Sequence, residues 1–365
     1  MHVGVSGRTF TVEEPGGAVR VGMTHAKRLP TNVDRTTVFG HDSLREAAQE
    51  YTVESTGFYA QSLPFGILWE QALFPTLAAR SGVDIGFFPN TLCPLRPTEF
   101  PVIVMIHGVP EYRGFGSDRY VAFRKRLLPR VASRADHIVT VSEFSKRQIA
   151  THLPVSSADI SVVYNGIGDR FLGDATGDAT LQLPEPYLLY VGAQSERKNF
   201  AGVLRAFERF KQTHDTDHSL VVVGPSQNAT YDVLDPEEFS PSTADAICQP
   251  GYVSDEELRY AYENAALFLF PSRYEGFGLP PLEAAAVGTP VVSSRVGAIP
   301  EILGETAEYV DPDDPYDIAD GVWRMLQRTD DEQVRATAEA LGEYTWARAS
   351  TRLTEVLRDV FEGAS

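Results

Sequence analysis

The feature that most constrains the fold is a regular alternation of short, β-branched apolar runs with helix-forming segments. This alternation is typical of parallel strands joined by helices that cover both faces of a sheet. The expected strands form two series: His2–Ser6, Thr36–Phe39, Ile85–Phe88, Val102–Ile106, His137–Val141 and Ile160–Val163, then Tyr187–Val191, Leu220–Gly224, Ala266–Phe270 and Pro290–Ser293. The pattern therefore predicts an α/β protein with two doubly wound domains and a ligand crevice between the carboxyl ends of both sheets.

The domain boundary is expected near residue 170. The two series of strands are separated by Asn165-Gly166 and by residues 168–183, which are rich in Gly, Asp, Ala and Thr and indicate a linker. We place an N-terminal domain at residues 1–170 and a C-terminal domain at 171–344. Residues 345–365 form a third part, in which apolar side chains at helical spacing predict an amphipathic helix: Ala349, Leu353, Val356, Leu357 and Val360.

The charge of the chain excludes one class of partner. The 365 residues include 50 acids and 32 bases, giving a formal charge of −18, and only five of the bases are lysine. A protein this acidic is unsuited to binding nucleic acid. The acidic, lysine-poor composition fits a halophilic source, because concentrated salt screens the self-repulsion of such a surface. The alternative is an acidic mesophile with a GC-rich genome.

Apolar runs are too short for a membrane span. The longest, such as Val102–Ile106 and Ala265–Phe270, have five or six residues, whereas a spanning helix needs about 20. The first ten residues lack the basic and apolar regions of a secretory signal. Cys93 and Cys248 stand outside any disulfide or metal-binding pattern. We therefore expect a cytoplasmic protein.

The densest motif of the chain is EGFGLPPLE at residues 275–283, which follows the expected strand Ala266–Phe270 and opens a helix. Glycines at 276 and 278 allow a ligand to approach the backbone closely. The amides of Phe277, Gly278 and Leu279, at the helix N-terminus, are placed to accept a phosphate. The motif therefore predicts an anion-binding loop.

Both glutamates of this motif are candidate ligand-binding residues. We expect Glu283 in the first helical turn, where its carboxylate would hold two ribose hydroxyls, and Glu275 on the loop itself. The alternative is a tight strand–helix connection with one solvated and one capping glutamate.

A second basic motif, GAQSERKN at residues 192–199, follows the expected strand Tyr187–Val191. Gly192 permits a tight turn, and Arg197 and Lys198 stand where the next helix begins. Cations are unfavourable at a helix N-terminus, so a bound anion such as a diphosphate would explain them. The alternative is a solvated basic turn.

These motifs resemble those of the retaining glycosyltransferases of family 4, which have the GT-B fold. The resemblance covers nearly the whole chain and includes the Glu-x7-Glu pattern at Glu275 and Glu283, GAQSERKN, VSEFSKRQI at 141–149, YNGI at 164–167 and GYVSDEEL at 251–258. Leu-Trp-Glu-Gln at 68–71 and the Arg-Lys-Asn after the strand are most similar to the mannosyltransferase-like branch. The resemblance implies two Rossmann-like domains facing a donor crevice, with the C-terminal helix crossing back to the N-domain.

The resemblance also implies roles for individual residues of the C-terminal, donor-binding domain. Lys198, with Arg197, binds the donor diphosphate, Glu283 holds the ribose, and Glu275 contacts the sugar. Tyr252 and Val253, within GYVSDEEL, belong to the donor site. One departure is Ala193, because many relatives have an arginine directly after the glycine equivalent to Gly192.

In the N-terminal, acceptor-binding domain the resemblance is looser. Gly7 is followed by eight residues before Gly16-Gly17, whereas relatives have a short glycine-rich loop after the first strand. We interpret Gly16 and Gly17 as the glycine loop near the phosphates, with a plain helix start as the alternative. His107 ends the strand Val102–Ile106, where relatives carry a histidine near the transferred sugar and the acceptor. A buried structural histidine is the alternative.

Two polar segments have simpler interpretations. Asp311-Pro-Asp313-Asp314 resembles a metal-binding Asp-x-Asp, but it lies between a strand and a helix and is interpreted as a turn and cap, so no metal requirement is expected. Ser142 is expected to cap the helix that begins at Glu143, not to act as a nucleophile.

One basic segment stands out in this acidic chain. Residues 119–134 contain six bases, no acid and an apolar stripe, although Pro129 should kink or interrupt the helix. A basic amphipathic helix favours docking on anionic lipid headgroups. An ordinary solvated helix is the alternative.

Taken with these features, the resemblance implies a retaining, metal-independent glycosyltransferase. It would move a hexose, mannose or glucose, from a nucleotide diphosphate donor to a glycan or polyprenyl-linked acceptor, and it would need no cofactor. The alternatives are a sugar-nucleotide epimerase on the same fold and a non-catalytic subunit that binds nucleotide sugars.

Overall fold

The computed structural model describes residues 1–11, 16–47, 50–55, 63–173, 181–224, 239–251, 253–328 and 341–364. The chain divides into two compact units, one formed by Met1–Gly166 with Tyr344–Ser365 and the other by Ile167–Glu343. Part of the expected linker, residues 174–180, lies outside the described residues.

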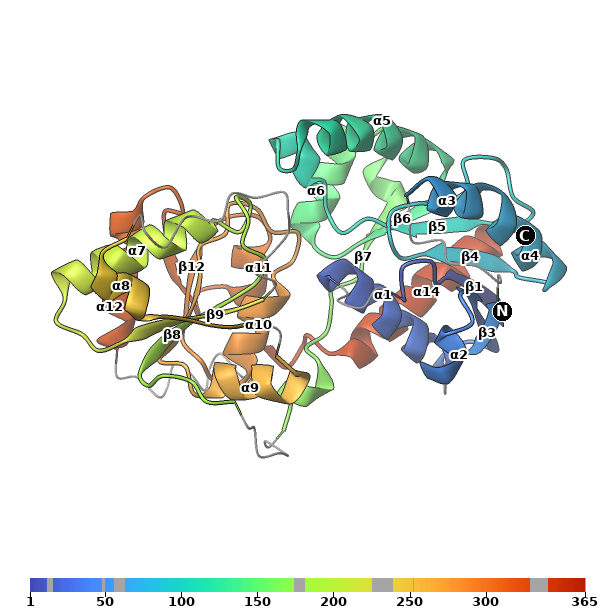
Figure 1. The fold of residues 1–365 in the computed structure, drawn as a ribbon. Helices are drawn as coiled ribbons and strands as arrows, with labels where there is room; N and C mark the ends of the chain where they lie inside the picture. The colour runs from blue at the N-terminus through green and yellow to red at the C-terminus, as the bar shows by residue number, and fades with distance from the viewer. Residues whose placement is uncertain are drawn as a thin grey trace. The chain divides into compact units, whose positions relative to one another are not determined.

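Unit 1 is built on a parallel sheet of seven strands in the order β3-β2-β1-β4-β5-β6-β7 (Figure 1). The strands are β1 His2–Ser6, β2 Arg35–Gly40, β3 Thr52–Ser55, β4 Ile85–Phe88, β5 Val102–Met105, β6 His137–Thr140 and β7 Ile160–Val162. The sequence analysis predicted all of them except β3. The chain moves outward from β1 through β2 to β3 on one side and from β4 to β7 on the other, as in a doubly wound fold.

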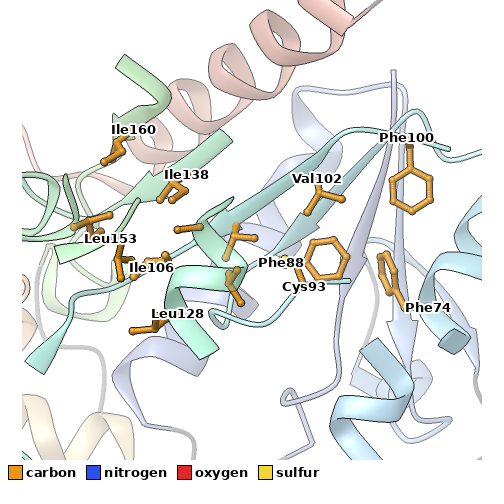
Figure 2. Close-up of a cluster of buried hydrophobic side chains, with 14 of the residues drawn as sticks. Phe74, Phe88, Cys93, Phe100, Val102, Ile106, Leu128, Ile138, Leu153 and Ile160 are labelled. Atoms are coloured by element: carbon orange, nitrogen blue, oxygen red, sulfur yellow. The ribbon is translucent and has the colours of Figure 1, made fainter. Parts of the chain in front are cut away.

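Helices cover both faces of this sheet. They are α1 Gly17–Arg28, α2 Leu44–Ala47, α3 Leu63–Leu68, α4 Phe74–Arg80, α5 Asp118–Arg134, α6 Glu143–His152 and α14 Trp346–Ala364, with a π-helix at Trp69–Leu73. Side chains from α4, α5 and α6 form one core with alternate residues of the strands, including Phe88, Val102 and Ile138 (Figure 2). Successive side chains of a strand point to opposite faces, so Phe87 packs on the other face, against α1.

The C-terminal helix belongs to unit 1, which confirms that the tail returns to the N-terminal domain. Helix α14 packs against α1, and Asn32 donates a hydrogen bond of 3.1 Å to Ser350. Close packing requires a glycine at position 166, because a Cβ there would lie 2.1 Å from the backbone nitrogen of Trp346. In the predicted apolar row, Ala349, Leu353, Val356 and Leu357 are buried, and Val360 is partly buried.

A buried histidine lies between these two helices. His25 of α1 is 0% exposed, and its ring lies edge-on to Phe87 and Trp346, with centroid distances of 6.3 and 5.4 Å. Neither ring nitrogen has a hydrogen-bond partner among the described residues. Burial, with smaller effects of His107 and Arg28, lowers the pKa of His25 to about 3.

This histidine should make the protein acid-sensitive. The folded state keeps His25 neutral, whereas the unfolded chain protonates it below the ordinary pKa of 6.5. Stability is therefore fully present above that pKa and is lost as the pH falls toward 3. The free energy of unfolding can be measured with urea at pH 7 and at pH 5. Between these two pH values, we expect it to fall by about 2 kcal/mol more in the wild type than in His25→Phe. Equal losses would show that His25 does not control acid stability.

Unit 2 contains a parallel sheet of six strands in the order β10-β9-β8-β11-β12-β13. The strands are β8 Tyr187–Val191, β9 Ser219–Val223, β10 Ile247–Gly251, β11 Leu267–Phe270, β12 Val291–Ser294 and β13 Glu308–Val310. The edge strand β10 was not predicted. Two parallel sheets covered by helices confirm the predicted fold class.

The helices of unit 2 are α7 Phe200–Thr213, α8 Pro241–Asp245, α9 Asp255–Glu263, α10 Leu279–Ala286, α11 Ile299–Leu303 and α12 Pro315–Leu326. Figure 1 shows α7 and α12 on one face of the sheet and α9 and α10 on the other. Helix α9 begins with the predicted capping box, in which Ser254 and Glu257 bond each other's backbone amides. No helix in the described part of the chain combines the length and apolar composition of a membrane span.

Candidate functional site

The two motifs of the C-terminal half lie side by side at the carboxyl ends of two central strands in the unit 2 sheet. Strands β8 and β11 are neighbours, with Leu188 paired to Leu267, although β9 and β10 intervene in the sequence. The chain winds away from this pair in both directions, so their carboxyl ends form the topological switch point where α/β sheets bind ligands. The loop 192–199 follows β8 and the loop 271–278 follows β11.

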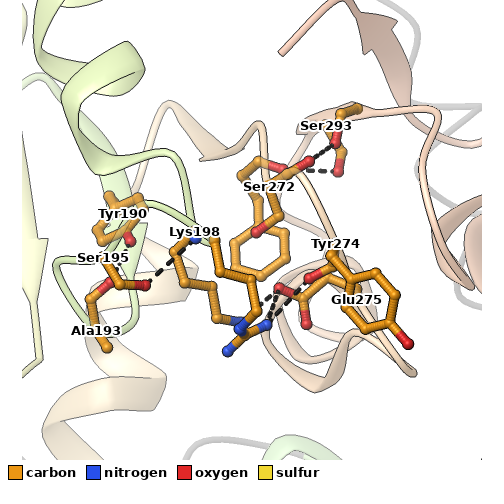
Figure 3. A network of polar contacts seen from close by, with 11 residues as sticks. Tyr190, Ala193, Ser195, Lys198, Ser272, Tyr274, Glu275 and Ser293 are labelled. Carbon is orange, nitrogen blue, oxygen red and sulfur yellow. Dashed lines mark hydrogen bonds and ion pairs between the residues drawn. The ribbon is translucent and has the colours of Figure 1, made fainter. Parts of the chain in front are cut away.

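Three charged side chains from these loops form an ion cluster (Figure 3). The Nζ atom of Lys198 lies 2.8 Å from Oε1 of Glu275, and Nη1 of Arg197 donates to the same oxygen at 3.1 Å. Arg197 also donates to the carbonyl of Tyr274 at 3.0 Å, and Nζ of Lys198 lies 4.5 Å from the ring centroid of Phe270. One carboxylate thus faces two cations.

Burial sets the charge state of this cluster. The side chains of Lys198 and Glu275 are 11% and 8% exposed, whereas that of Arg197 is 32% exposed. Burial, assisted by the charge of Arg197, lowers the pKa of Lys198 to about 8 although Glu275 opposes the shift. Burial alone would raise the pKa of Glu275, but Lys198 and Arg197 outweigh it and hold that pKa below its ordinary value. The cluster carries one net positive charge near neutral pH.

Hydrogen bonds and close packing connect the loops around the cluster. Asn199 adopts a left-handed conformation at φ 55°, and its side-chain amide donates to the carbonyls of Pro271 and Pro312. It therefore ties together the loops that follow β8, β11 and β13. Gly297 has φ 63° and approaches Glu275 so closely that a Cβ would lie 2.2 Å from its carbonyl oxygen. The sequence analysis included Asn199 in a motif but did not identify this role.

Helix α10 starts beside the cluster, and its start differs in one respect from the expectation. Gly278 is the N-cap, with φ 104°, and no side chain caps the helix. The first turn contains no acid, so Glu283, five residues into the helix, lies in the second turn and not in the predicted first turn. Its Oε2 accepts a hydrogen bond of 3.3 Å from the buried Tyr262 of α9, a partner that no sequence motif indicated. Phe277 is buried next to the uncapped helix start.

Two further predicted donor-site residues lie near the same sheet. Gly192 has φ 151°, and its carbonyl oxygen would lie 2.5 Å from a Cβ at Gly224, so the loops after β8 and β9 are in close contact. Val253 is buried one residue before the α9 cap. Tyr252 lies outside the described residues.

In unit 1, His107 follows β5 at the carboxyl edge of the sheet and is partly buried. Its Nε2 lies 2.9 Å from the carbonyl oxygen of Pro89, which only accepts, so Nε2 carries the proton and Nδ1 of the neutral ring is an acceptor. Burial, with a smaller effect of Arg124, lowers the pKa of His107 to about 4 even though the bond to Pro89 opposes the shift. The ring is therefore neutral at physiological pH.

The glycines expected near the phosphates stand at the start of α1. Gly16 is the N-cap, with φ −64°, and a Cβ at Gly16 or Gly17 would meet no heavy atom within 4 Å. Neither packing among the described residues nor backbone conformation requires glycine here. The role assigned to both stays a prediction.

The aspartates that resemble a metal motif form a turn and a cap, as predicted. Asp311 accepts from the amide of Asp313, and Asp314 caps α12 by accepting from the amide of Tyr316. Arg273 pairs with Asp313 at 2.7 Å. The predicted cap of α6 by Ser142 is also confirmed. Within the described ranges, no group of three or more His, Cys, Asp or Glu side chains could hold a metal ion.

The basic segment of unit 1 forms the single helix α5, which continues through Pro129 without interruption. Arg124 is turned inward: its Nε lies 3.3 Å from Oε1 of the buried Glu111, in the segment after His107. Arg119, Lys125, Arg126 and Arg130 are exposed. Arg124 therefore braces the loop after His107 and does not belong to the exposed basic face.

The two parallel sheets, each wound outward from a switch point, define a protein with two Rossmann-like domains. Residues 15–170 match the family model of glycosyltransferase family 4, and residues 177–345 match that of the glycosyl transferases group 1. The chain belongs to this family of GT-B glycosyltransferases.

Individual relatives agree with this classification. The chain is 30% identical over 260 residues to the O-antigen chain mannosyltransferase B of Escherichia coli, covering 68% of this chain and 66% of the relative. In two further relatives, both mannosyltransferases, the matched region spans 47% and 50% of the relative's length.

Solved structures share the fold over the whole chain. The sucrose-phosphate synthase of Thermosynechococcus elongatus matches with a TM-score of 0.74 and 19% identity, covering 100% of both chains. The Anabaena protein HepE, in complex with UDP and glucose, matches with a TM-score of 0.72 and 14% identity, covering 98% of this chain and 100% of that one.

Proposed function

We propose that the protein is a retaining, metal-independent hexosyltransferase that transfers mannose or glucose from a nucleoside diphosphate sugar to a glycan or polyprenyl-linked acceptor. The observation that carries this proposal is the Lys198–Glu275–Arg197 cluster at the carboxyl ends of β8 and β11. The mannosyltransferase relatives and the complex of HepE with UDP and glucose support the choice of donor and sugar.

The chemistry of such a transfer matches the charges of the cluster. Breaking the glycosidic bond to the donor leaves a nucleoside diphosphate, so negative charge develops on the phosphate oxygens. Fixed cations in a partly dry site stabilise that charge without reorganising. Lys198 and Arg197 supply the cations in this proposal, and Gly278 and Leu279 supply backbone amides at the start of α10, where the two prolines that follow have none.

The other residues are assigned to the sugar and the acceptor. Glu275 contacts the hexose beside the phosphates, and Glu283, supported by Tyr262, accepts hydrogen bonds from the ribose. His107, through its unprotonated Nδ1, accepts a hydrogen bond from a hydroxyl of the sugar or the acceptor.

Incubation with nucleotide sugars tests the function. The protein is mixed with UDP-, GDP- and ADP-linked glucose and mannose, with and without extracted glycan and lipid acceptors. We expect release of the nucleoside diphosphate and labelled product only when an acceptor is present. Release without an acceptor would indicate the epimerase, and binding without release would indicate a non-catalytic subunit.

The assignment of Glu283 predicts a loss of ribose recognition. A carboxylate accepts charge-assisted hydrogen bonds from both ribose hydroxyls, each worth about 1.5–3 kcal/mol. Glu283→Gln should therefore weaken nucleoside diphosphate binding at least tenfold and reduce the preference for the ribo- over the 2′-deoxyribonucleotide. Calorimetry with both nucleotides measures this preference. Tyr262→Phe is the matched variant and should show a smaller change in the same direction, while unchanged discrimination in Glu283→Gln would place the ribose elsewhere.

We also propose that α5 docks on anionic lipid at the inner face of the membrane. Its exposed bases include Lys125, Arg126 and Arg130, and Tyr120 of the same helix is 52% exposed. A lipid-linked acceptor would be presented at the same surface. Arg124 is excluded from this face because it pairs with Glu111.

Reversal of two charges tests the docking. Lys125→Glu with Arg126→Glu should weaken binding to phosphatidylserine vesicles at low salt, on a scale of about 1 kcal/mol per base removed. The effect should vanish at high ionic strength. The control reverses two exposed bases of α14, Arg348 and Arg352. Equal weakening by both pairs would show only a general charge effect, and a wild type that ignores the vesicles would refute the docking.

A further inference from the structure

A second charged cluster lies in unit 1, at the carboxyl end of β1. Glu70, in the π-helix Trp69–Leu73, is 2% exposed, and its Oε1 accepts hydrogen bonds from Ser6 Oγ at 2.8 Å and from Arg8 Nε at 3.3 Å. Ser6 is the last residue of β1, and Arg8 follows it by two residues. None of the motifs in the sequence analysis used Arg8 or assigned a role to Glu70.

The cluster lies at the switch point of its own sheet. Strand β1 lies between β2 and β4, and the chain winds outward from the β1–β4 pair in both directions. The loop after β1 is tied to the loop after β4 by a hydrogen bond from Asn90 to Thr9. This is the place in an open α/β sheet where a ligand binds, and π-helical turns are frequent at functional sites.

The bonds within the cluster are incomplete in a way that points to a ligand. Arg8 uses only Nε, and its two terminal Nη groups donate to no described residue, although its side chain is only 10% exposed. Oε2 of Glu70 is buried and has no partner among the described residues. Glu70 thus anchors one edge of the guanidinium and leaves its two-pronged end available.

We infer that Arg8, held in place by Glu70 and Ser6, is a phosphate-binding residue of unit 1. A guanidinium presents paired donors that match two phosphate oxygens, and anchoring through Nε fixes the direction of that fork. The inference rests on the proposed function, which supplies two sources of such a phosphate: the donor diphosphate and a phosphate that links the acceptor to its lipid.

The protonation of Glu70 gives the proposal a distinctive signature. Burial raises the pKa of Glu70 to about 7, although Arg8 and Ser6 oppose the shift. The positive charge of Arg8 stabilises the ionised form of Glu70. An anion bound to Arg8 would offset part of that positive charge and would therefore raise the pKa of Glu70 further. Binding near pH 7 should therefore take up a proton, whereas a merely structural ion pair would give no such coupling.

Calorimetry on the full-length chain tests the inference without any turnover. The probes are UDP and GDP for the donor, and geranyl diphosphate, compared with geraniol, for a lipid-linked acceptor. Arg8→Gln should weaken one of the two classes of probe at least tenfold and leave the other within twofold. The class that is weakened identifies the source of the phosphate. Titration in buffers of different ionisation enthalpy should show a larger proton uptake in the wild type than in Glu70→Gln.

Controls separate binding from stability. Arg134→Gln removes an arginine at the end of α5, in the same unit, that also pairs with a carboxylate, Asp136, and should leave all the affinities unchanged. If Arg8→Gln does not fold, Arg8→Lys keeps the charge but lacks the fork and should still weaken binding. Unchanged affinity for every probe in a folded Arg8 variant, or no binding of any probe by the wild type, would overturn the inference. Transfer in the nucleotide-sugar assay would leave the proposed function standing in either case.

Discussion

Replacing Lys198 with alanine is expected to lower kcat/KM for the nucleotide sugar by about 10²–10³, the scale for loss of one fixed group that stabilises developing charge. Lys198 is buried between Glu275 and the ring of Phe270, so bulk water cannot replace its ammonium group in stabilising the phosphate charge. Arg197 remains in the variant but is partly exposed and shares the same carboxylate. Steady-state kinetics at saturating acceptor measure the loss.

The matched control is Lys198→Arg, which keeps the cation. It should retain most of the donor affinity, although the longer side chain disturbs the contact with Phe270. A folded Lys198→Ala variant with near-wild-type kcat/KM would place the leaving-group charge elsewhere.

Replacing Glu275 with glutamine is expected to have opposite effects on the free protein and on its complex. The change leaves Lys198 and Arg197 facing each other without a counter-charge, and removal of one partner from a buried ion pair commonly costs 3–5 kcal/mol. Because Arg197 is partly exposed, we expect a loss of roughly 2–3 kcal/mol in the free energy of unfolding. A nucleoside diphosphate brings the missing negative charge, so its affinity should rise while turnover falls.

Thermal unfolding with and without nucleoside diphosphate measures both effects. The melting temperature of free Glu275→Gln should drop by several degrees, and the shift caused by the nucleotide should exceed that of the wild type. Glu305→Gln is the control, because Glu305 pairs with Arg295 at an exposed site of unit 2. A variant that is destabilised but gains no extra shift would show that the diphosphate does not replace Glu275 at the two cations.

Much of this site could be predicted from the sequence because its residues follow strongly apolar strands. The runs at Tyr187–Val191 and Ala266–Phe270 are central and buried, so the pattern located both strands and placed Lys198 and Glu275 at carboxyl ends. The missed strands are both at sheet edges. Thr52–Ser55 is polar and partly exposed, and Ile247–Gly251 contains a proline and a glycine, as edge strands tolerate.

Pairings between side chains that lie far apart in the sequence could not be predicted from it. The spacing of Glu275 and Glu283 did not reveal that Glu275 faces two cations or that Tyr262 supports Glu283. Arg124 was grouped with its exposed neighbours on α5 because the sequence gives no sign of the buried Glu111 partner. Such pairings depend on which loops the topology brings together.

The same limit explains why the Arg8–Glu70 cluster was not found. The two residues are far apart in the chain, and the π-helix that carries Glu70 shifts its register in a way that apolar periodicity does not show.

Halophily and the location of the protein rest on composition alone and stay predictions.

The most direct test of the central claim is the pH dependence of nucleoside diphosphate affinity for the wild type and for Lys198→Arg. In the free protein the pKa of Lys198 is about 8, and phosphate binding needs the protonated amine. Calorimetry between pH 7 and pH 10 should show the wild-type affinity falling by up to about tenfold per pH unit above that pKa, whereas the arginine variant should show no such fall. If both proteins follow the same profile, Lys198 does not bind the diphosphate and the proposed donor site is wrong.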